Sequence, residues 1–155
     1  MLARAALFAA LLLPSLAAAQ AGPITASDPD TVLAAIRAWG HKAKLETAEA
    51  GNPLIAVEHA GIKYWVNFYG CDKPGGCLDL QFYSSFDLEP GFDANWANDW
   101  NYSWVAGRAD VNEQGDPALS YFVTTIGGLS QENFDGVMEV WNMTLDGFLE
   151  DIGWQ

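Results

Sequence analysis

The chain has 155 residues, of which 50% are hydrophobic and 17% are charged. Its 7 Lys and Arg stand against 20 Asp and Glu, a formal net charge of −13, which excludes a typical nucleic-acid-binding protein. The composition is typical of one globular domain and argues against a disordered, collagenous or coiled-coil protein.

The N-terminus has the pattern of a secretory signal peptide over residues 1–19. Arg4 precedes an apolar stretch, and Ala17 and Ala19 then match the A-x-A cleavage pattern. The apolar stretch is shorter than the roughly 20 residues that a membrane-spanning helix needs. We therefore expect cleavage after Ala19, which leaves residues 20–155 as a single periplasmic or secreted domain without a membrane span.

The first element of the mature domain is predicted to be a helix over residues 29–39. Asp28 suits the N-cap, Pro29 suits the first helical position, and Gly40 ends the helix. Apolar residues recur at helical spacing and should face the core: Val32, Leu33, Ile36 and Trp39.

Strand-like segments separated by Gly-rich turns follow the first helix. We expect strands over residues 44–48, 54–58 and 62–69, and a fourth strand over residues 78–86. One side of the fourth strand should carry Leu78, Leu80, Phe82 and Ser84. Short connections make this meander antiparallel.

A second helix is predicted over residues 93–104, because three tryptophans at four-residue spacing would share one of its faces: Trp96, Trp100 and Trp104. We expect Trp39, Trp141 and at least part of this tryptophan ladder to pack against the sheet. Strands over residues 105–111 and 118–126 should then form a hairpin.

The last element is the clearest helix, with apolar residues every three or four positions from Phe134 to Ile152 behind a Ser130 cap. The order is therefore helix, four strands, helix, two strands, helix. This order predicts an α+β fold in which an antiparallel sheet has helices packed on it, α-β-β-β-β-α-β-β-α.

Cys71 and Cys77 are the only cysteines and flank a tight Gly- and Pro-containing loop between two predicted strands. In an exported protein this spacing favours a disulfide that fixes a hairpin. A redox couple or a metal site is disfavoured, because the CxxC spacing and further nearby ligands are missing.

No pattern indicates a catalytic residue. His41 and His59 have no recognisable partners, and GxSxG, GxGxxG and P-loop motifs are missing, so neither a nucleotide nor another cofactor is expected. The polar loop Asp110, Asn112, Glu113, Gly115 and Asp116 has a weak likeness to a calcium loop. Gln114 and Tyr121 occupy two required ligand positions, so a hairpin turn is favoured and no metal ligand is assigned.

Aromatic residues give the best candidate for a binding surface. Trp65 and Tyr69 alternate with the apolar residues of their strand, and Tyr83 lies on the next one. A second aromatic face on a strand must be covered or bind something. We therefore predict a recognition surface that contains Trp65, Tyr69 and Tyr83.

Several stretches resemble the YbjN family, which is described as bacterial sensory transduction regulators: residues 24–29, 68–71, 77–82, Trp100-Asn101 and 115–117. The resemblance extends over residues 24–153 and implies an α+β fold similar to type III secretion chaperones. It implies neither an enzymatic activity nor a cofactor. The signal peptide and the cysteine pair depart from the cytosolic members, which favours a role in the bacterial envelope.

Three functions stay open. The leading hypothesis is a non-enzymatic domain that recognises a peptide or an envelope protein. The second is a structural, homo-oligomeric envelope component such as a homodimer. The third is a carboxylate- or metal-dependent hydrolase built from the loop around Asp110, Asn112, Glu113 and Asp116.

Overall fold

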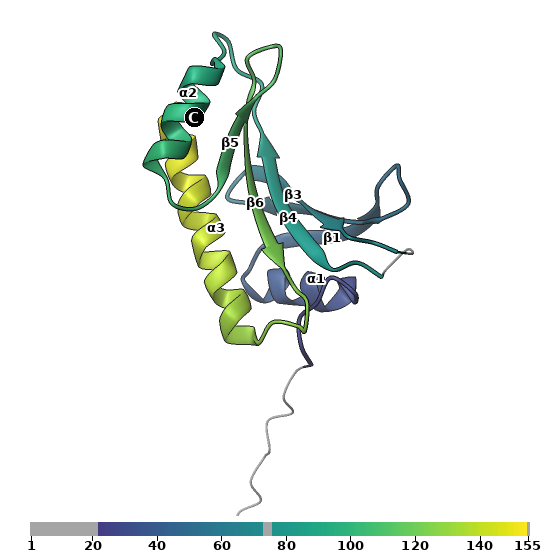
Figure 1. Ribbon diagram of the computed structural model, residues 1–155. Helices are drawn as coiled ribbons and strands as arrows, with labels where there is room; N and C mark the ends of the chain where they lie inside the picture. The colour runs from purple at the N-terminus through teal and green to yellow at the C-terminus, as the bar shows by residue number, and fades with distance from the viewer. Residues whose placement is uncertain (1–21, 73–75, 155) are drawn as a thin grey trace, which may run out of the picture.

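Six antiparallel strands form one sheet, and three helices cover one of its two faces (Figure 1). The computed structural model describes residues 22–72 and 76–154, so the predicted signal peptide lies outside the described residues. The predicted α+β class and the predicted order of elements are both confirmed.

The helices and strands have the following bounds: α1 Pro29–Ala38, β1 Lys42–Thr47, β2 Pro53–His59, β3 Ile62–Tyr69, β4 Asp79–Ser85, α2 Ala94–Ser103, β5 Arg108–Val111, β6 Pro117–Thr124 and α3 Gln131–Asp151. Most predicted bounds agree to within two residues. The fifth strand differs more, because residues 105–107 precede β5 as an irregular connection.

The spatial order of the strands is β1-β2-β3-β4-β6-β5. The first four strands follow the chain, whereas β6 pairs with β4 and places β5 at the edge. β1 is the opposite edge. Every pairing is antiparallel, as expected for strands joined by hairpins and one helical connection.

The core lies between the sheet and the helices. Alternate side chains of β3, namely Tyr64, Val66 and Phe68, are buried on this side, as are Leu80 and Phe82 of β4. Trp141 of α3 sits centrally against the sheet, with its ring centroid 5.3 Å from that of Tyr64 and 5.5 Å from that of Phe82. The apolar stripe of α3 therefore covers the middle of the sheet.

Local signals explain where the helices begin. Pro29 occupies the first turn of α1, and the Ser130 hydroxyl accepts a hydrogen bond from the Asn133 amide at the start of α3. Asp28 is the N-cap of α1, but its side chain makes no capping hydrogen bond. Asp93 caps α2 by accepting from the Trp96 amide, which lowers the pKa of this carboxyl.

The tryptophan ladder of α2 faces α3, although only Trp100 is fully buried. The indole N–H groups of Trp100 and Trp104 both donate to Oδ2 of Asp151, at 3.0 and 3.2 Å. A side chain at Gly147 would clash with the ring of Trp104. The small residue and the shared carboxylate thus allow α2 to lie close against α3.

A disulfide joins Cys71 to Cys77 at the end of the β3–β4 hairpin. Next to it, the Leu78 amide donates to the Tyr69 carbonyl, so the two strands are held together from their first pair. The Leu78 side chain is 47% exposed. Its residue precedes the first ladder position at Asp79, so the alternation of β4 does not bury it.

Candidate functional site

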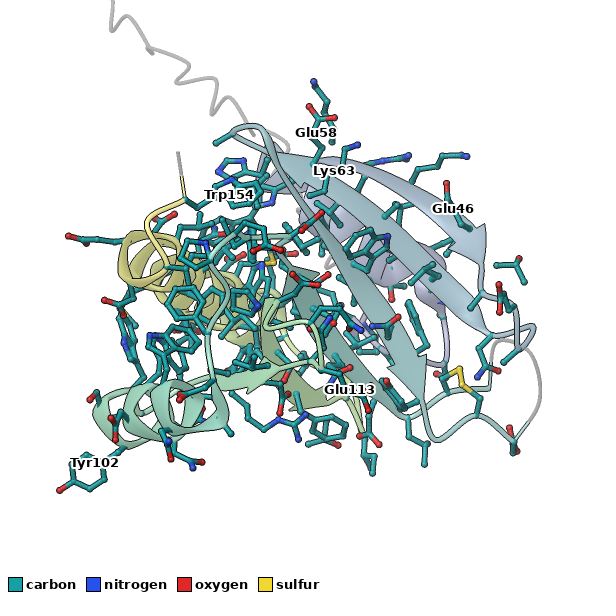
Figure 2. All side chains as sticks on the ribbon, turned by 90° about the horizontal axis from the view of Figure 1, so that it is seen from above. Glu46, Glu58, Lys63, Tyr102, Glu113 and Trp154 are labelled. Carbon is teal, nitrogen blue, oxygen red and sulfur yellow. A yellow bond between two sulfur atoms is a disulfide. The ribbon has the colours of Figure 1, made fainter. Side chains whose placement is uncertain are left out.

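The sheet face opposite the helices carries a distinctive set of side chains. We call this surface the open face and define it by the side chains that alternate with the core: Lys42, Lys44, Glu46, Leu54, Ala56, Glu58, Lys63, Trp65, Asn67, Tyr69, Asp79, Gln81, Tyr83, Ser85, Arg108, Asp110, Ala118, Ser120, Phe122 and Thr124. In Figure 2, Glu46, Glu58 and Lys63 extend from this face, while α1 lies behind the sheet.

The strand register aligns one residue from each strand into a row across the open face. This central row consists of Lys44, Ala56, Trp65, Tyr83, Ser120 and Arg108. Trp65 and Tyr83 are direct cross-strand neighbours at its centre. Two of the three predicted surface residues therefore form an aromatic pair, and each is half-buried rather than covered.

Small residues flank the aromatic pair and leave a hollow on each side. Ala56 lies in a hollow of about 450 Å³ between Lys44 and Trp65. Ser120 lies in another of about 390 Å³, which Arg108 and Phe122 also line. The central row thus alternates a cation, a hollow, an aromatic ridge, a second hollow and a second cation.

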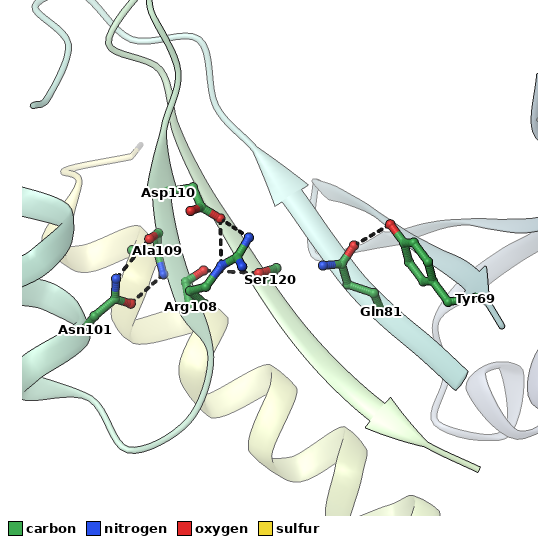
Figure 3. Close-up of polar contacts among 7 residues, drawn as sticks. All are labelled: Tyr69, Gln81, Asn101, Arg108, Ala109, Asp110 and Ser120. Atoms are coloured by element: carbon green, nitrogen blue, oxygen red, sulfur yellow. Dashed lines mark hydrogen bonds and ion pairs between the residues drawn. The ribbon is translucent and has the colours of Figure 1, made fainter. Parts of the chain in front are cut away.

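The third predicted residue, Tyr69, lies on the same face near the disulfide and is 46% exposed. Its hydroxyl donates to the Gln81 side chain at 3.1 Å (Figure 3). The register of β3 and β4 places Tyr69 opposite Asp79, so Tyr69 is not a direct neighbour of the Trp65–Tyr83 pair. The open face therefore holds all three predicted residues, with Tyr69 toward one end.

Sequence reasoning missed two members of this surface. Phe122 is 58% exposed and lies opposite Gln81, and Arg108 ends the central row. Both come from the β5–β6 hairpin, which reaches this position only because β6 pairs with β4. The sequence offered one signal for Phe122, namely an aromatic side chain within a predicted strand.

Charge is distributed unevenly between the open face and the rest of the molecule. The face carries Lys42, Lys44, Lys63 and Arg108, which are four of the 7 basic residues in the chain. Four acids accompany them, namely Glu46, Glu58, Asp79 and Asp110. Outside this face, Arg37 is the one base among the described residues. The open face is thus close to neutral in a strongly acidic protein.

Three exposed ion pairs link these charges: Lys42 with Glu58 at 3.2 Å, Lys44 with Glu46 at 2.9 Å, and Arg108 with Asp110 at 2.6 Å. Figure 3 shows Arg108 beside Asp110 and Ser120. Exposed pairs of this kind contribute little to stability, so their groups are free to change partners when a ligand binds. Lys63 makes no ion pair within the described part of the chain.

The two histidines meet at the core side of the β1–β2 hairpin. Their rings stack with centroids 3.8 Å apart, and Nδ1 of His41 lies 2.9 Å from the Tyr64 hydroxyl. His41 is buried, and burial together with the neighbouring His59 lowers its pKa to about 4. Burial also raises the pKa of Tyr64. Neutral His41 thus orients a core tyrosine, and nothing in this arrangement faces the open surface.

The polar loop from Asp110 to Asp116 folds as a hairpin turn rather than a calcium-binding loop. The Asn112 side-chain oxygen accepts from the amides of Gln114 and Asp116, both at 2.9 Å, and its amide donates to the Asp116 carboxylate. This is a local side-chain turn. Across residues 22–72 and 76–154, no three His, Cys, Asp or Glu side chains gather in a way that could hold a metal ion.

The family model of YbjN, whose description reads "Putative bacterial sensory transduction regulator", matches residues 28–154. The chain belongs to the YbjN family. This identification agrees with the resemblance seen in the sequence, and the description is that of a regulator rather than of an enzyme.

The fold of this YbjN-family chain is similar to that in a solved structure titled "Crystal structure of YbjN, a putative transcription regulator from E. coli". The TM-score is 0.55 at 13% sequence identity, over 75% of this chain and 84% of that one. At this identity the likeness concerns the fold. Comparison with curated proteins found no significant match.

One observation bears on where the YbjN-family chain resides. The disulfide between Cys71 and Cys77 is compatible with export into an oxidising compartment. None of the helices in the described part of the chain has the length and apolar character to cross a membrane.

Proposed function

We propose that this YbjN-family chain is a non-enzymatic recognition module of the bacterial envelope that binds an extended segment of a polypeptide across its open face. The observation that carries the proposal is the central row, where the Trp65–Tyr83 pair stands uncovered between two hollows. Exposed aromatic pairs beside small residues are typical of protein-binding surfaces.

The spacing of the hollows supports an extended occupant. Ala56 and Ser120 are three strands apart, a distance of about 14 Å at the usual strand spacing. Side chains four residues apart on an extended chain are separated by about the same distance and point to the same side. One such segment therefore fits a side chain into each hollow with its backbone over the aromatic pair.

The charge distribution favours binding of a polypeptide to the open face rather than to another part of the surface. The net charge of −13 repels anionic molecules from most of the surface, whereas the open face is balanced. Lys44 and Arg108 at the two ends of the row offer donors to backbone carbonyls or side-chain carboxylates of the bound segment.

Affinity capture from native periplasm tests this proposal. We expect the wild-type domain to retain a polypeptide reproducibly, and we expect Trp65→Ala to lose it. Tyr102→Ala is the matched control, because Tyr102 is 93% exposed but belongs to α2, away from the open face (Figure 2). Equal retention by the two variants, or no retained polypeptide, contradicts the proposal and favours a structural homo-oligomer.

A further inference from the structure

The two edge strands of the sheet differ in whether their outward backbone groups have hydrogen-bond partners. At the β5 edge, the Asn101 side chain bonds both backbone groups of Ala109: its amide donates to the carbonyl at 3.0 Å, and its oxygen accepts from the N–H at 2.8 Å (Figure 3). Asn101 thus replaces a neighbouring strand. β5 is also only 4 residues long, so this edge is closed to further pairing.

The β1 edge is longer and largely uncovered. Ala48 pairs with Asn52 through its amide, and Thr47 lies opposite Pro53, which has no N–H. By the alternation of an antiparallel ladder, Lys42, Lys44 and Glu46 bond to β2. The backbone groups of Ala43, Leu45 and Thr47 therefore point outward.

Only one of these outward groups has a partner within the described residues. The Arg37 guanidinium donates to the Ala43 carbonyl at 2.7 and 3.0 Å. The N–H and C=O groups of Leu45 and Thr47 receive no such contact. A free edge of this kind is a template for another strand.

We propose that β1 pairs with β1 of a second copy of this chain, antiparallel and around a two-fold axis at Leu45. In this register Leu45 lies opposite Leu45, and Lys44 lies opposite Glu46 of the second copy. The two-fold axis produces each contact twice, as in any isologous interface. The strand is therefore complementary to itself in charge.

Charge also selects this register over its neighbours. A shift by two residues in one direction places Lys44 opposite Lys44, although it also places Lys42 opposite Glu46, and a shift in the other places Glu46 opposite Glu46. Either shift puts like charges side by side on the open face. Arg37 donates two hydrogen bonds to the Ala43 carbonyl, so it has to release one of them when the Thr47 amide of the second copy donates to the same oxygen.

The charge around β1 permits the approach of a second acidic copy. Lys42, Lys44 and Lys63 balance Glu46 and Glu58 on this part of the sheet, whereas most of the remaining surface is acidic. Pairing of a single strand from each copy buries little area, so we expect a weak and reversible dimer. The two open faces then lie on the same side of one continuous sheet, which would increase the avidity for a partner with two binding segments.

Sedimentation velocity of the purified protein over a wide concentration range tests the proposal. We expect a monomer–dimer equilibrium for the wild type. Thr47→Pro should abolish the dimer, because it removes an outward N–H while the β1–β2 ladder keeps its hydrogen bonds. A wild-type monomer up to the highest soluble concentration overturns the proposal and leaves the edge to another occupant.

A charge exchange tests the register. Lys44→Glu and Glu46→Lys should each weaken dimerisation by about tenfold, because each creates two like-charge contacts. An equimolar mixture of the two variants should restore the dimer, since every contact is then between opposite charges. Lys42→Glu is the control, because it changes the charge by the same amount outside the predicted pairs. A dimer that is insensitive to both variants, or no recovery on mixing, overturns the proposed pairing.

Discussion

Tyr64 and Trp65 are neighbours in the chain and face opposite sides of the same strand. Tyr64 is 1% exposed, packs against Trp141 and bonds to His41. Trp65 is half-buried, and its direct cross-strand partners are Ala56 and Tyr83. The aromatic residues of one face are packed against helices, whereas no helix in the described part of the chain covers those of the other face. Substitutions on the two faces should therefore have different consequences.

The largest expected effect is on the helix-covered face. Trp141→Ala should lower the free energy of unfolding by about 3–5 kcal/mol, because it removes a fully buried indole at the centre of the core. Trp65→Ala should cost less, about 1–2 kcal/mol, because part of its side chain already contacts solvent. Urea denaturation measures both values. Equal losses of stability would remove the distinction between the two faces.

The buried histidine His41 lies on the helix-covered face, and it predicts that the stability of the fold depends on pH. His41 has a pKa of about 4 in the fold against 6.5 when unfolded, so the unfolded chain takes up the proton first. Stability is full above pH 6.5 and should fall as the pH drops toward 4, by up to about 3 kcal/mol. Unfolding by urea between pH 7 and pH 5 checks this.

His41→Gln is the matched variant for that measurement. It should remove the fall in stability between pH 7 and pH 5, whereas carboxylates contribute mainly at lower pH. A pH profile identical to that of the wild type would show that the His41 environment is not responsible.

The next prediction concerns the disulfide at the end of the β3–β4 hairpin, close to Tyr69 of the open face. Reduction, or replacement of Cys71 and Cys77 by Ser, should lower stability by about 2 kcal/mol without unfolding the domain. The reason is that the bond constrains the unfolded chain, while the core is large enough to fold without it. An unchanged melting temperature under reducing conditions would contradict this expectation.

The smallest effect concerns the closed edge. Asn101→Ala should cost about 1 kcal/mol, because the backbone groups of Ala109 exchange two hydrogen bonds for water. Asn98 on the same helix is exposed and its side chain makes no hydrogen bond among the described residues, so Asn98→Ala serves as the control. If both variants unfold at the same temperature, Asn101 does not secure this edge.

The fold could be predicted largely from the sequence because its signals are local. The apolar repeat behind Ser130 predicted α3, and the alternation around Tyr64 and Val66 predicted β3. The fourth strand was predicted to begin at Leu78, one residue before β4 begins, because alternation does not reveal the residue at which pairing begins. Similarly, Val105 was assigned to a strand for its composition, but it is fully exposed before β5.

The candidate site could be predicted only in part. Trp65, Tyr69 and Tyr83 come from adjacent strands, so alternation alone was enough to place them on one face. Phe122 and Arg108 depend on the pairing of β6 with β4, which no local pattern encodes. The contact of His41 with His59 and Tyr64 likewise requires the register of three strands.

The most direct test of the recognition surface is photo-crosslinking in the native host. A benzophenone amino acid replaces either Tyr83, in the central row, or Tyr102, which is more exposed but lies on α2. The account predicts a covalent product with another polypeptide from position 83, which disappears when Trp65→Ala is added. It predicts no product from position 102. Equal products from both positions, or a product from position 102 alone, would contradict a binding role for the open face.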